Sequence, residues 1–308
     1  MPLTEQQLAE RNQYIGASDI PIIMGFSTFM NPYDLWLQKT GRLVENGKAS
    51  KAAEAGIELE PLILNRASQE LGRIKKSTAK GQALEFRITI EGVLYVVHPD
   101  GIALEKQGRP VEAKSSGILY PTAEHWGEPG SDDIPDRVIL QSHGQMMATG
   151  KDICYVPVVL TGMKFSIYEI PFRQEIRDAI VESCCGFKRN HIDKDIPPEN
   201  VLPSIDFARR IRRQPNRTVS IPASLISAYE EAKAFAKEAD YRKTQAQNAI
   251  LAALDGADGA IADDGRKLTN LTYTRTGIDT DRLKKEKPEI AAKYKKITEY
   301  QSFRFPKK

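Results

Sequence analysis

The stretch VLYVVHPDGIALEKQGRPVEAKSS, residues 93–116, decides the fold. It contains three β-rich runs, VLYVV, GIAL and PVEAK, which are separated by residues that favour turns. Asp100 follows the first run, and Glu112 and Lys114 lie in the last one. Because side chains alternate along a strand, Glu112 and Lys114 are expected on the same face. The stretch therefore predicts a sheet at which two carboxylates and a lysine converge.

Such a group of side chains has a specific chemistry. Two carboxylates at a sheet can hold Mg²⁺, which prefers oxygen ligands and keeps several waters. A lysine beside the ion can orient or deprotonate an attacking water and stabilise charge on a phosphate. These are the requirements of metal-assisted phosphodiester hydrolysis. The spacing from Asp100 to the E-x-K run also arises by chance in charged proteins, where a surface salt bridge is the alternative.

Polar residues on both sides of this stretch strengthen the hypothesis. Glu60 is predicted on a helix before the sheet, where a third carboxylate could reach the metal. Gln141 is predicted on the helix that follows, where it can hydrogen-bond a phosphate or the lysine. Arg11 and Ser18 bracket a turn at Gly16. A guanidinium, a hydroxyl and the N–H groups of a helix start together suit a phosphate.

Helical periodicity surrounds the β-rich middle of the chain. Helices that flank a mixed sheet are the simplest architecture for this order, which is an α/β (α+β) fold. The predicted helices cover residues 4–14, an apolar run that ends near Gly25, and residues 33–41, 50–72, 134–150 and 172–190; further strands are predicted at 86–90, 153–160 and 164–170.

The chain changes character after a linker around residues 196–203. Residues 222–254 are Ala-rich with apolar residues in coiled-coil-like spacing, and Asp264-Gly265 predicts a hairpin turn. We therefore predict two domains, residues 1–205 and 206–308. The first has 22 basic and 27 acidic residues, and the second has 22 basic and 14 acidic. A basic extension can bind phosphates without sequence preference, although a solvated surface explains the charge equally well.

Several classes of protein are disfavoured by the composition. Cys154, Cys184 and Cys185 offer neither a disulfide framework nor the spacing of a zinc or iron–sulfur site. Cys184 and Cys185 lie in an apolar pattern that indicates buried thiols. No apolar run is long enough to cross a membrane, and the N-terminal residues lack the apolar stretch of a signal peptide. We expect a cytoplasmic, reducing location.

Six motifs, taken in order, resemble the YqaJ-type viral recombinase family, which includes lambda exonuclease within the PD-(D/E)xK nuclease superfamily. The resemblance spans about residues 11–150 and implies a restriction-endonuclease-like fold, with a mixed central sheet flanked by helices. His98 departs from the pattern, because a small residue is expected before PDG. The motifs are R-x(3)-IGASDI, P-x-x-LW-x-x-KTG, G-x-x-x-EP, PDG, E-x-K and Q-x(3)-QMMATG.

The resemblance also implies a role for each residue of the active centre. Asp100, Glu112 and the carbonyl of Ala113 would hold the metal, and Glu60 would help at a second metal. Lys114 would activate the attacking water. Two Mg²⁺ ions are expected, with Mn²⁺ as a substitute.

Further residues and partners follow from the same resemblance. Gln141 would support the lysine or the scissile phosphate, and Arg11 and Ser18 would recognise the 5′-phosphate of the strand being digested. The expected function is a 5′-to-3′ exonuclease of phage-type recombination that acts on double-stranded DNA ends in a bacterial host cell. It would leave 3′ overhangs for a single-strand annealing protein. A homo-oligomer, a trimer in lambda exonuclease, is a further expectation.

Two rival functions remain at this point. An endonuclease or junction resolvase would use the same three active-site residues without a pocket for the strand end. A non-catalytic DNA-binding scaffold would have a degenerate site, which the intact Asp100, Glu112 and Lys114 disfavour.

Overall fold

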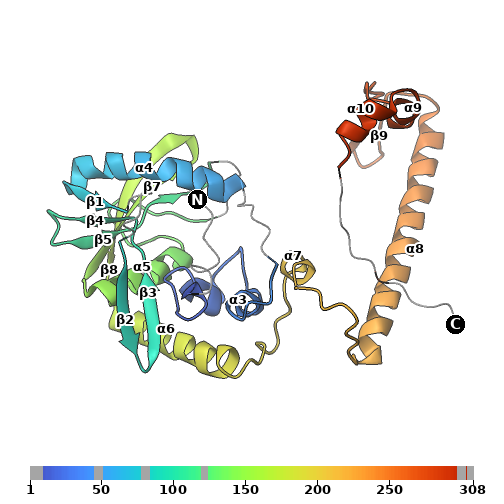
Figure 1. The fold of residues 1–308 in the computed structure, drawn as a ribbon. Coiled ribbons are helices and arrows are strands. Elements are labelled where there is room, and N and C mark those ends of the chain that lie inside the picture. Colours follow the sequence, from blue (N-terminus) through green and yellow to red (C-terminus); the bar gives the residue numbers. More distant parts are fainter. Residues whose placement is uncertain (1–9, 45–50, 78–83, 119–123, 297–302, 304–308) are drawn as a thin grey trace. The chain divides into compact units, whose positions relative to one another are not determined.

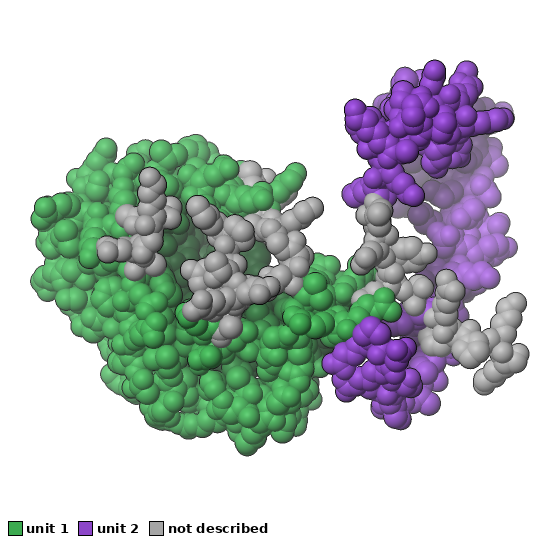
Figure 2. Space-filling model, viewed as in Figure 1, with its two compact units in different colours: residues 1–213 green, residues 214–308 purple. Residues whose placement is uncertain are grey.

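The computed structural model describes residues 10–44, 51–77, 84–118, 124–296 and 303. The chain divides into two compact units, residues 1–213 and 214–308 (Figure 2). The linker and the change of pattern after it predict a boundary at residue 205, whereas α7 (Ile205–Arg209) packs on α3 (Pro32–Lys39) and lies in the first unit.

A mixed six-stranded sheet forms the centre of the first unit (Figure 1). The long strand β7 lies between β8, which is antiparallel to it, and the successive strands β5 and β6, which are parallel to it. β4 and β1 continue the sheet beyond β5 in antiparallel pairing. The six strands are β1 (Ile74–Lys76), β4 (Gly101–Ala103), β5 (Arg109–Val111), β6 (Lys114–Ser115), β7 (Ile153–Leu160) and β8 (Lys164–Pro171).

Helices cover both faces of this sheet because β7 is apolar on both sides. Cys154, Val156 and Val158 pack in one core cluster with α5 (Asp136–Thr149). Tyr155, between them in sequence, packs in another cluster with α4 (Lys51–Leu71). Alternating residues of one strand thus bury against opposite layers, as expected for a strand inside a covered sheet. The predicted mixed sheet flanked by helices is confirmed.

The remaining elements of the first unit complete the layer around α5. β2 (Phe86–Ile90) and β3 (Val93–Val97) form a separate two-stranded sheet, and both contact α5. α6 (Gln174–Phe187) packs against α5 and α2 (Ile20–Ile23), and continues as a π-helical turn.

The helix predicted over residues 4–14 and the basic C-terminal tail both lie partly outside the described residues. The helix predicted over residues 4–14 ends at Arg11, because residues 12–14 form a turn, and residues 1–9 are not described. The C-terminal basic tail beyond residue 296 is described only at Phe303.

The described residues of the second unit form a long helix, a hairpin and two short helices. The predicted helix and hairpin are both confirmed, with Gly265 at a φ of 84° in the hairpin turn, a conformation that glycine adopts without strain. The elements are α8 (Ala223–Leu254), β9 (Gly259–Ile261), β10 (Lys267–Thr269), α9 (Thr280–Glu286) and α10 (Pro288–Lys293).

The three cysteines are buried and free, and the predicted burial of Cys184 and Cys185 is confirmed. Within the described residues, the helices lack the combination of length and apolar character that spanning a membrane requires.

A buried ion pair fixes the N-terminal loop of the first unit. Nζ of Lys39 lies 2.7 Å from Oδ2 of Asp19, and their side chains are 1% and 4% exposed. The same ammonium donates to the backbone oxygens of Arg11 and Tyr14, at 2.8 and 2.7 Å. Asp19 in turn accepts from the backbone N–H of Gly16 at 2.8 Å. Residues 11–19 are thus held by one buried lysine.

We predict that Lys39→Met strongly destabilises the first unit. Methionine retains most of the side-chain volume but leaves the Asp19 carboxylate buried without its counter-charge, a loss of about 3–5 kcal/mol. Chemical denaturation followed by circular dichroism measures the change. Arg189→Met is the control, because the Arg189–Glu91 pair is about half exposed and such pairs contribute at most about 1 kcal/mol. Equal effects of the two substitutions would contradict the role given to Lys39.

Candidate active site

Glu112 lies at the centre of a hydrogen-bonded group at the edge of the sheet. The residue is 4% exposed. Its Oε1 accepts from Nζ of Lys114 at 2.7 Å and from Nε2 of Gln141 at 2.5 Å. Its Oε2 accepts from Nε2 of Gln145 at 2.9 Å. A buried carboxylate is tolerated only when its oxygens are satisfied in this way, so the four side chains form one unit.

The strand register explains why Glu112 and Lys114 meet. Val111 pairs with Tyr155 and Lys114 pairs with Val158, so the extended chain keeps one register through the short gap between β5 and β6. Side chains two residues apart then point to the same face, as the sequence predicts.

Asp100, which immediately precedes β4, joins this group. Its Oδ2 accepts from the backbone N–H of Ala113 at 2.7 Å. Burial raises the pKa of Asp100 well above its usual value, and the nearby carboxylates of Glu112 and Glu60 raise it further, whereas Lys114 lowers it. The structure therefore brings Asp100, Glu112 and Lys114 together.

Glu60 reaches the group from α4. The pKa of Glu60 is raised by burial and by the charge of Glu112, and lowered by Lys114. Three carboxylates thus influence one another while a single lysine offsets their charge. This excess of negative charge is unfavourable in a partly buried place, and a cation would relieve it.

The donor set fits a divalent metal ion in its chemistry. Carboxylate and carbonyl oxygens are the ligands that Mg²⁺ and Mn²⁺ accept. Among the described residues, no three side chains of His, Cys, Asp or Glu stand close enough to form a metal cluster without rearrangement. The residues that would hold an ion are Glu60, Asp100, Glu112 and, through its carbonyl, Ala113.

A cavity of about 460 Å³ is lined by the two glutamines that bind Glu112. Arg11 and Ser18 line one part of it, and an Nη2–Oγ distance of 3.4 Å brings their side chains together. Gln141 and Gln145 line another part. Because both glutamines also bind Glu112, the Arg11–Ser18 pair and the carboxylates are connected through the same two side chains.

The histidines near the site, His98 and His143, have partners other than Glu60, Asp100 and Glu112. Nε2 of His98 lies 3.2 Å from a carboxylate oxygen of Glu85, on the wall of the same cavity. His143 is buried, its Nδ1 bonds the carbonyl of Ile139 and its Nε2 accepts from the N–H of Arg173. Burial lowers the pKa of His143. A neutral imidazole held by two backbone groups has a structural role.

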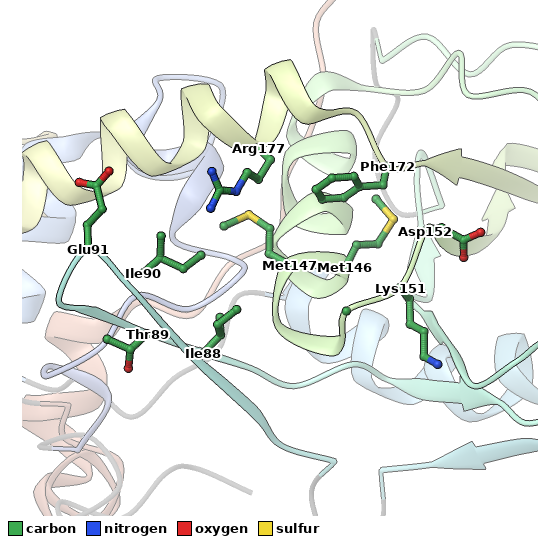
Figure 3. Close-up of a pocket in the computed structure, with 11 residues that line it drawn as sticks. Ile88, Thr89, Ile90, Glu91, Met146, Met147, Lys151, Asp152, Phe172 and Arg177 are labelled. Atoms are coloured by element: carbon green, nitrogen blue, oxygen red, sulfur yellow. The ribbon is translucent and has the colours of Figure 1, made fainter.

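A second cavity, of about 700 Å³, lies at the C-terminal end of α5 (Figure 3). Met146, Met147 and Phe172 give it an apolar wall, and the charged side chains of Lys151 and Arg177 also line it. None of the predicted site residues lines this cavity. Gln141, the predicted site residue on α5, lines the other cavity instead.

Two polar residues on the same face of α5 as Gln141 were not predicted from the sequence. Gln145 stands in the quoted Q-x(3)-Q motif, and its spacing of one helical turn from Gln141 was the available signal. Arg137 stands one turn before Gln141, and its guanidinium binds Glu124 through Nε at 2.6 Å and Nη2 at 2.9 Å. One face of α5 thus carries three polar side chains in successive turns.

Residues 7–152 match the family model of the YqaJ-like viral recombinase domain. This range contains all the predicted site residues, and the match confirms the resemblance of the six motifs. The chain is also similar to the uncharacterized protein YqaJ of Bacillus subtilis (strain 168). The two are 23% identical over 313 residues, which cover 97% of this chain and 93% of that protein.

Solved structures with a partial likeness include three exonucleases. An alkaline exonuclease from Laribacter hongkongensis has a TM-score of 0.45 at 20% identity, covering 62% of this chain and 94% of that one. A phage-related exonuclease from Haemophilus somnus 129PT has a TM-score of 0.41 at 13% identity, with coverages of 59% and 95%. A putative exonuclease from Eubacterium rectale has a TM-score of 0.45 at 13% identity, with coverages of 74% and 98%.

We predict that Gln145→Met weakens metal binding more than it weakens folding. The substitution removes the donor to Oε2 of Glu112, and losing such a supporting hydrogen bond typically costs about 10- to 100-fold in metal affinity. The effect on folding is smaller, because the substitution also removes Oε1 of Gln145, a buried oxygen without a hydrogen-bond partner among the described atoms, and this offsets part of the cost of leaving Oε2 of Glu112 without its donor. Calorimetric titration with Mn²⁺ measures the affinity, with the exposed Gln174→Met as control. Unchanged affinity in Gln145→Met would show that Glu112 does not depend on this donor.

We also predict a pH-dependent stability that originates at Asp100. Because its pKa is raised in the folded protein, the folded state keeps a proton that the unfolded chain releases near the usual value of about 3.9. The resulting stability is full below that value and is lost as pH rises through the raised pKa. In EDTA, the melting temperature of the wild type should therefore fall relative to that of Asp100→Asn as pH rises from about 4.

Thermal unfolding at a series of pH values measures this difference. Asp206→Asn, at an exposed aspartate, should follow the wild type throughout. Mg²⁺ should raise the melting temperature of the wild type and not that of Asp100→Asn, because an ion that binds only the folded state stabilises it. Parallel melting curves for wild type and Asp100→Asn would refute the burial of an unfavourable charge at this position.

Proposed function

Since residues 7–152 match the family model of the YqaJ-like viral recombinase domain, we propose that this protein is a Mg²⁺-dependent exonuclease that digests one strand of duplex DNA from 5′ to 3′. One observation carries the proposal. Gln141 and Gln145 line the cavity of Arg11 and Ser18 and also bind Glu112. A site that joins an anion pocket to a carboxylate cluster suits a substrate with a terminal phosphate and a nearby phosphodiester.

The carboxylates supply the metal-binding part of this proposal. Glu60, Asp100, Glu112 and the Ala113 carbonyl would hold one or two ions, with two expected from the family. When bound, Mg²⁺ supplies Lewis acidity toward a phosphoryl oxygen and lowers the pKa of a bound water. The raised pKa values of Asp100 and Glu60 indicate that these groups gain most from a cation.

The other side chains act on the substrate and the water. The ammonium of Lys114 is held by Glu112 and by Oε1 of Gln141 at 3.0 Å, so it has a fixed position from which to orient the water and stabilise charge on the phosphate. In the reaction, the water oxygen bonds to phosphorus while the bond from phosphorus to O3′ breaks, and O3′ takes up a proton. The products are a nucleoside 5′-monophosphate and a strand with a new 5′-phosphate.

Arg11 and Ser18 give the reaction its polarity in this proposal. A guanidinium binds two phosphate oxygens at once, and the hydroxyl of Ser18 can donate to a third. A strand end that carries a 5′-phosphate would then be held while the next phosphodiester lies at the carboxylates. Digestion in this direction leaves a 3′ overhang, which is a substrate for a single-strand annealing protein. A homo-oligomer, a trimer as in lambda exonuclease, would suit continuous digestion of one strand.

A nuclease assay on a linear duplex labelled at either end tests the proposal. With Mg²⁺ and a 5′-phosphate, nucleotides should be released from the 5′ end, and EDTA should stop the release. Lys114→Ala should lower the rate by about 10²–10³-fold, because it removes a donor placed at the developing charge. Lys194→Ala, at an exposed lysine outside the site, is the matched control. Arg11→Gln should remove the preference for a 5′-phosphate while cleavage continues.

The other outcomes identify the rival functions. Internal cutting that ignores the strand end would indicate an endonuclease or junction resolvase with the same carboxylates. Absence of cleavage in Mg²⁺ and in Mn²⁺, with DNA still bound, would indicate a non-catalytic scaffold.

A further inference from the structure

An exposed phenylalanine stands in a fixed loop beside the candidate active site. Phe29 lies between α2 and α3 and is 74% exposed. Oγ of Ser27 accepts from the backbone N–H groups of Phe29 and Met30, at 3.2 and 3.3 Å. Asn31 then caps α3, with its side chain accepting from the N–H of Asp34 at 3.0 Å. The backbone is thus held by local hydrogen bonds while the ring points to solvent.

A cation lies against this ring. The guanidinium carbon of Arg137 is 5.9 Å from the centroid of Phe29, within the range of a cation–π interaction. Arg137 is itself fixed by its two hydrogen bonds to Glu124, and Glu124 also accepts from Oγ of Ser116 at 2.9 Å. The Arg137 guanidinium holds the pKa of Glu124 below its usual value, so this carboxylate stays charged.

The contacts of Arg137 with Glu124 and its place on α5 both put it near proposed catalytic residues. Ser116 stands two residues after Lys114, so the two side chains leave the strand on the same face. Arg137 stands one helical turn before Gln141 on α5. Phe29 is therefore linked to Lys114 and Gln141 by these contacts and by neighbouring positions on the strand and on α5, although it lies far from both in sequence.

We propose that Phe29 stacks on an unpaired nucleobase of the DNA strand held at the carboxylate cluster, with Arg137 as the positioning residue for the ring. The inference rests on the proposed function. Aromatic side chains in single-strand binding sites stack on bases, and one such contact strengthens binding roughly 5- to 150-fold. Because every base has an aromatic face, the contact tolerates any sequence, as a processive nuclease requires. The base must be unpaired to present that face, so the ring would favour a frayed strand end.

Packing of the protein does not explain this ring. A single exposed apolar residue is common on protein surfaces and needs no special role. Phe29 differs because its backbone is fixed, its ring faces a cation that is already neutralised by Glu124, and this arrangement adjoins the strand that carries Lys114. Packing of the described chain would change little if the ring were replaced.

Fluorescence of 2-aminopurine tests the stacking in the full-length protein. The probe is a DNA duplex in which the first three nucleotides of one 5′-phosphorylated strand are unpaired. In separate probes, 2-aminopurine occupies each of these three positions. The protein binds the probe in EDTA. Stacking on an aromatic ring quenches this base. We expect quenching at one position or more in the wild type and in Phe29→Trp. Phe29→Leu, which keeps an apolar side chain without a π-face, should lose it and bind the strand roughly 5- to 150-fold more weakly.

The controls separate this inference from the proposed function. Phe235→Leu, at a ring of similar exposure in the second unit, should quench and bind like the wild type. With an abasic nucleotide at the quenched position, the wild type and Phe29→Leu should bind the strand with equal affinity. Metal-dependent digestion of the same DNA by the wild type tests the proposed function independently of the fluorescence. If Phe29→Leu quenches and binds like the wild type at all three positions, the stacking role is wrong, whether or not the DNA is digested.

Discussion

The structure of the candidate site depends on the need to satisfy one buried carboxylate. Glu112 is almost inaccessible to solvent, and an ionised group in such a place requires hydrogen-bond donors from the protein. Lys114 supplies one from the same strand, and Gln141 and Gln145 supply two more from α5. The donors fix the rotation and height of α5 against the sheet. α5 also packs against α2, the helix that follows the loop of Arg11 and Ser18.

The clustered carboxylates of the same site lower the stability of the fold. Asp100, Glu60 and Glu112 lie close enough to raise the pKa of the first two, and burial adds to the effect. A protein selected for stability alone would replace one of these acids by an amide or an apolar residue. Their presence together at the end of a sheet is best understood as an arrangement for a cation. The buried Asp19–Lys39 pair is different, because its charges are matched within the chain.

Local spacing in the sequence predicts part of this site and not the rest. The alternation of side chains places Glu112 beside Lys114, and helical periodicity gives the inner face of α4 as Leu64, Ala67 and Leu71, all three of which are buried. These features depend on neighbours along the chain. Contacts between distant segments, such as Asp19 with Lys39 or Phe29 with Arg137, follow from how the layers pack. Nothing in the local pattern around Arg137 indicates its partner, since the spacing that joins it to Gln141 is shared by many exposed helical residues.

The connection between the Arg11 cavity and the carboxylates has a consequence for where a DNA strand would be cleaved. One end of the connection is the loop of Arg11 and Ser18, which the buried Lys39 holds, and the other is the strand of Glu112, so the span between the two is a fixed length. Successive phosphates along a DNA strand are also separated by a nearly constant length, whatever the bases. Under the proposed function, the protein would cleave the phosphodiester that lies at a fixed distance along the backbone from the bound terminal phosphate. It would cut after the same number of nucleotides on every sequence, because the unit that it counts is the phosphate and not the base.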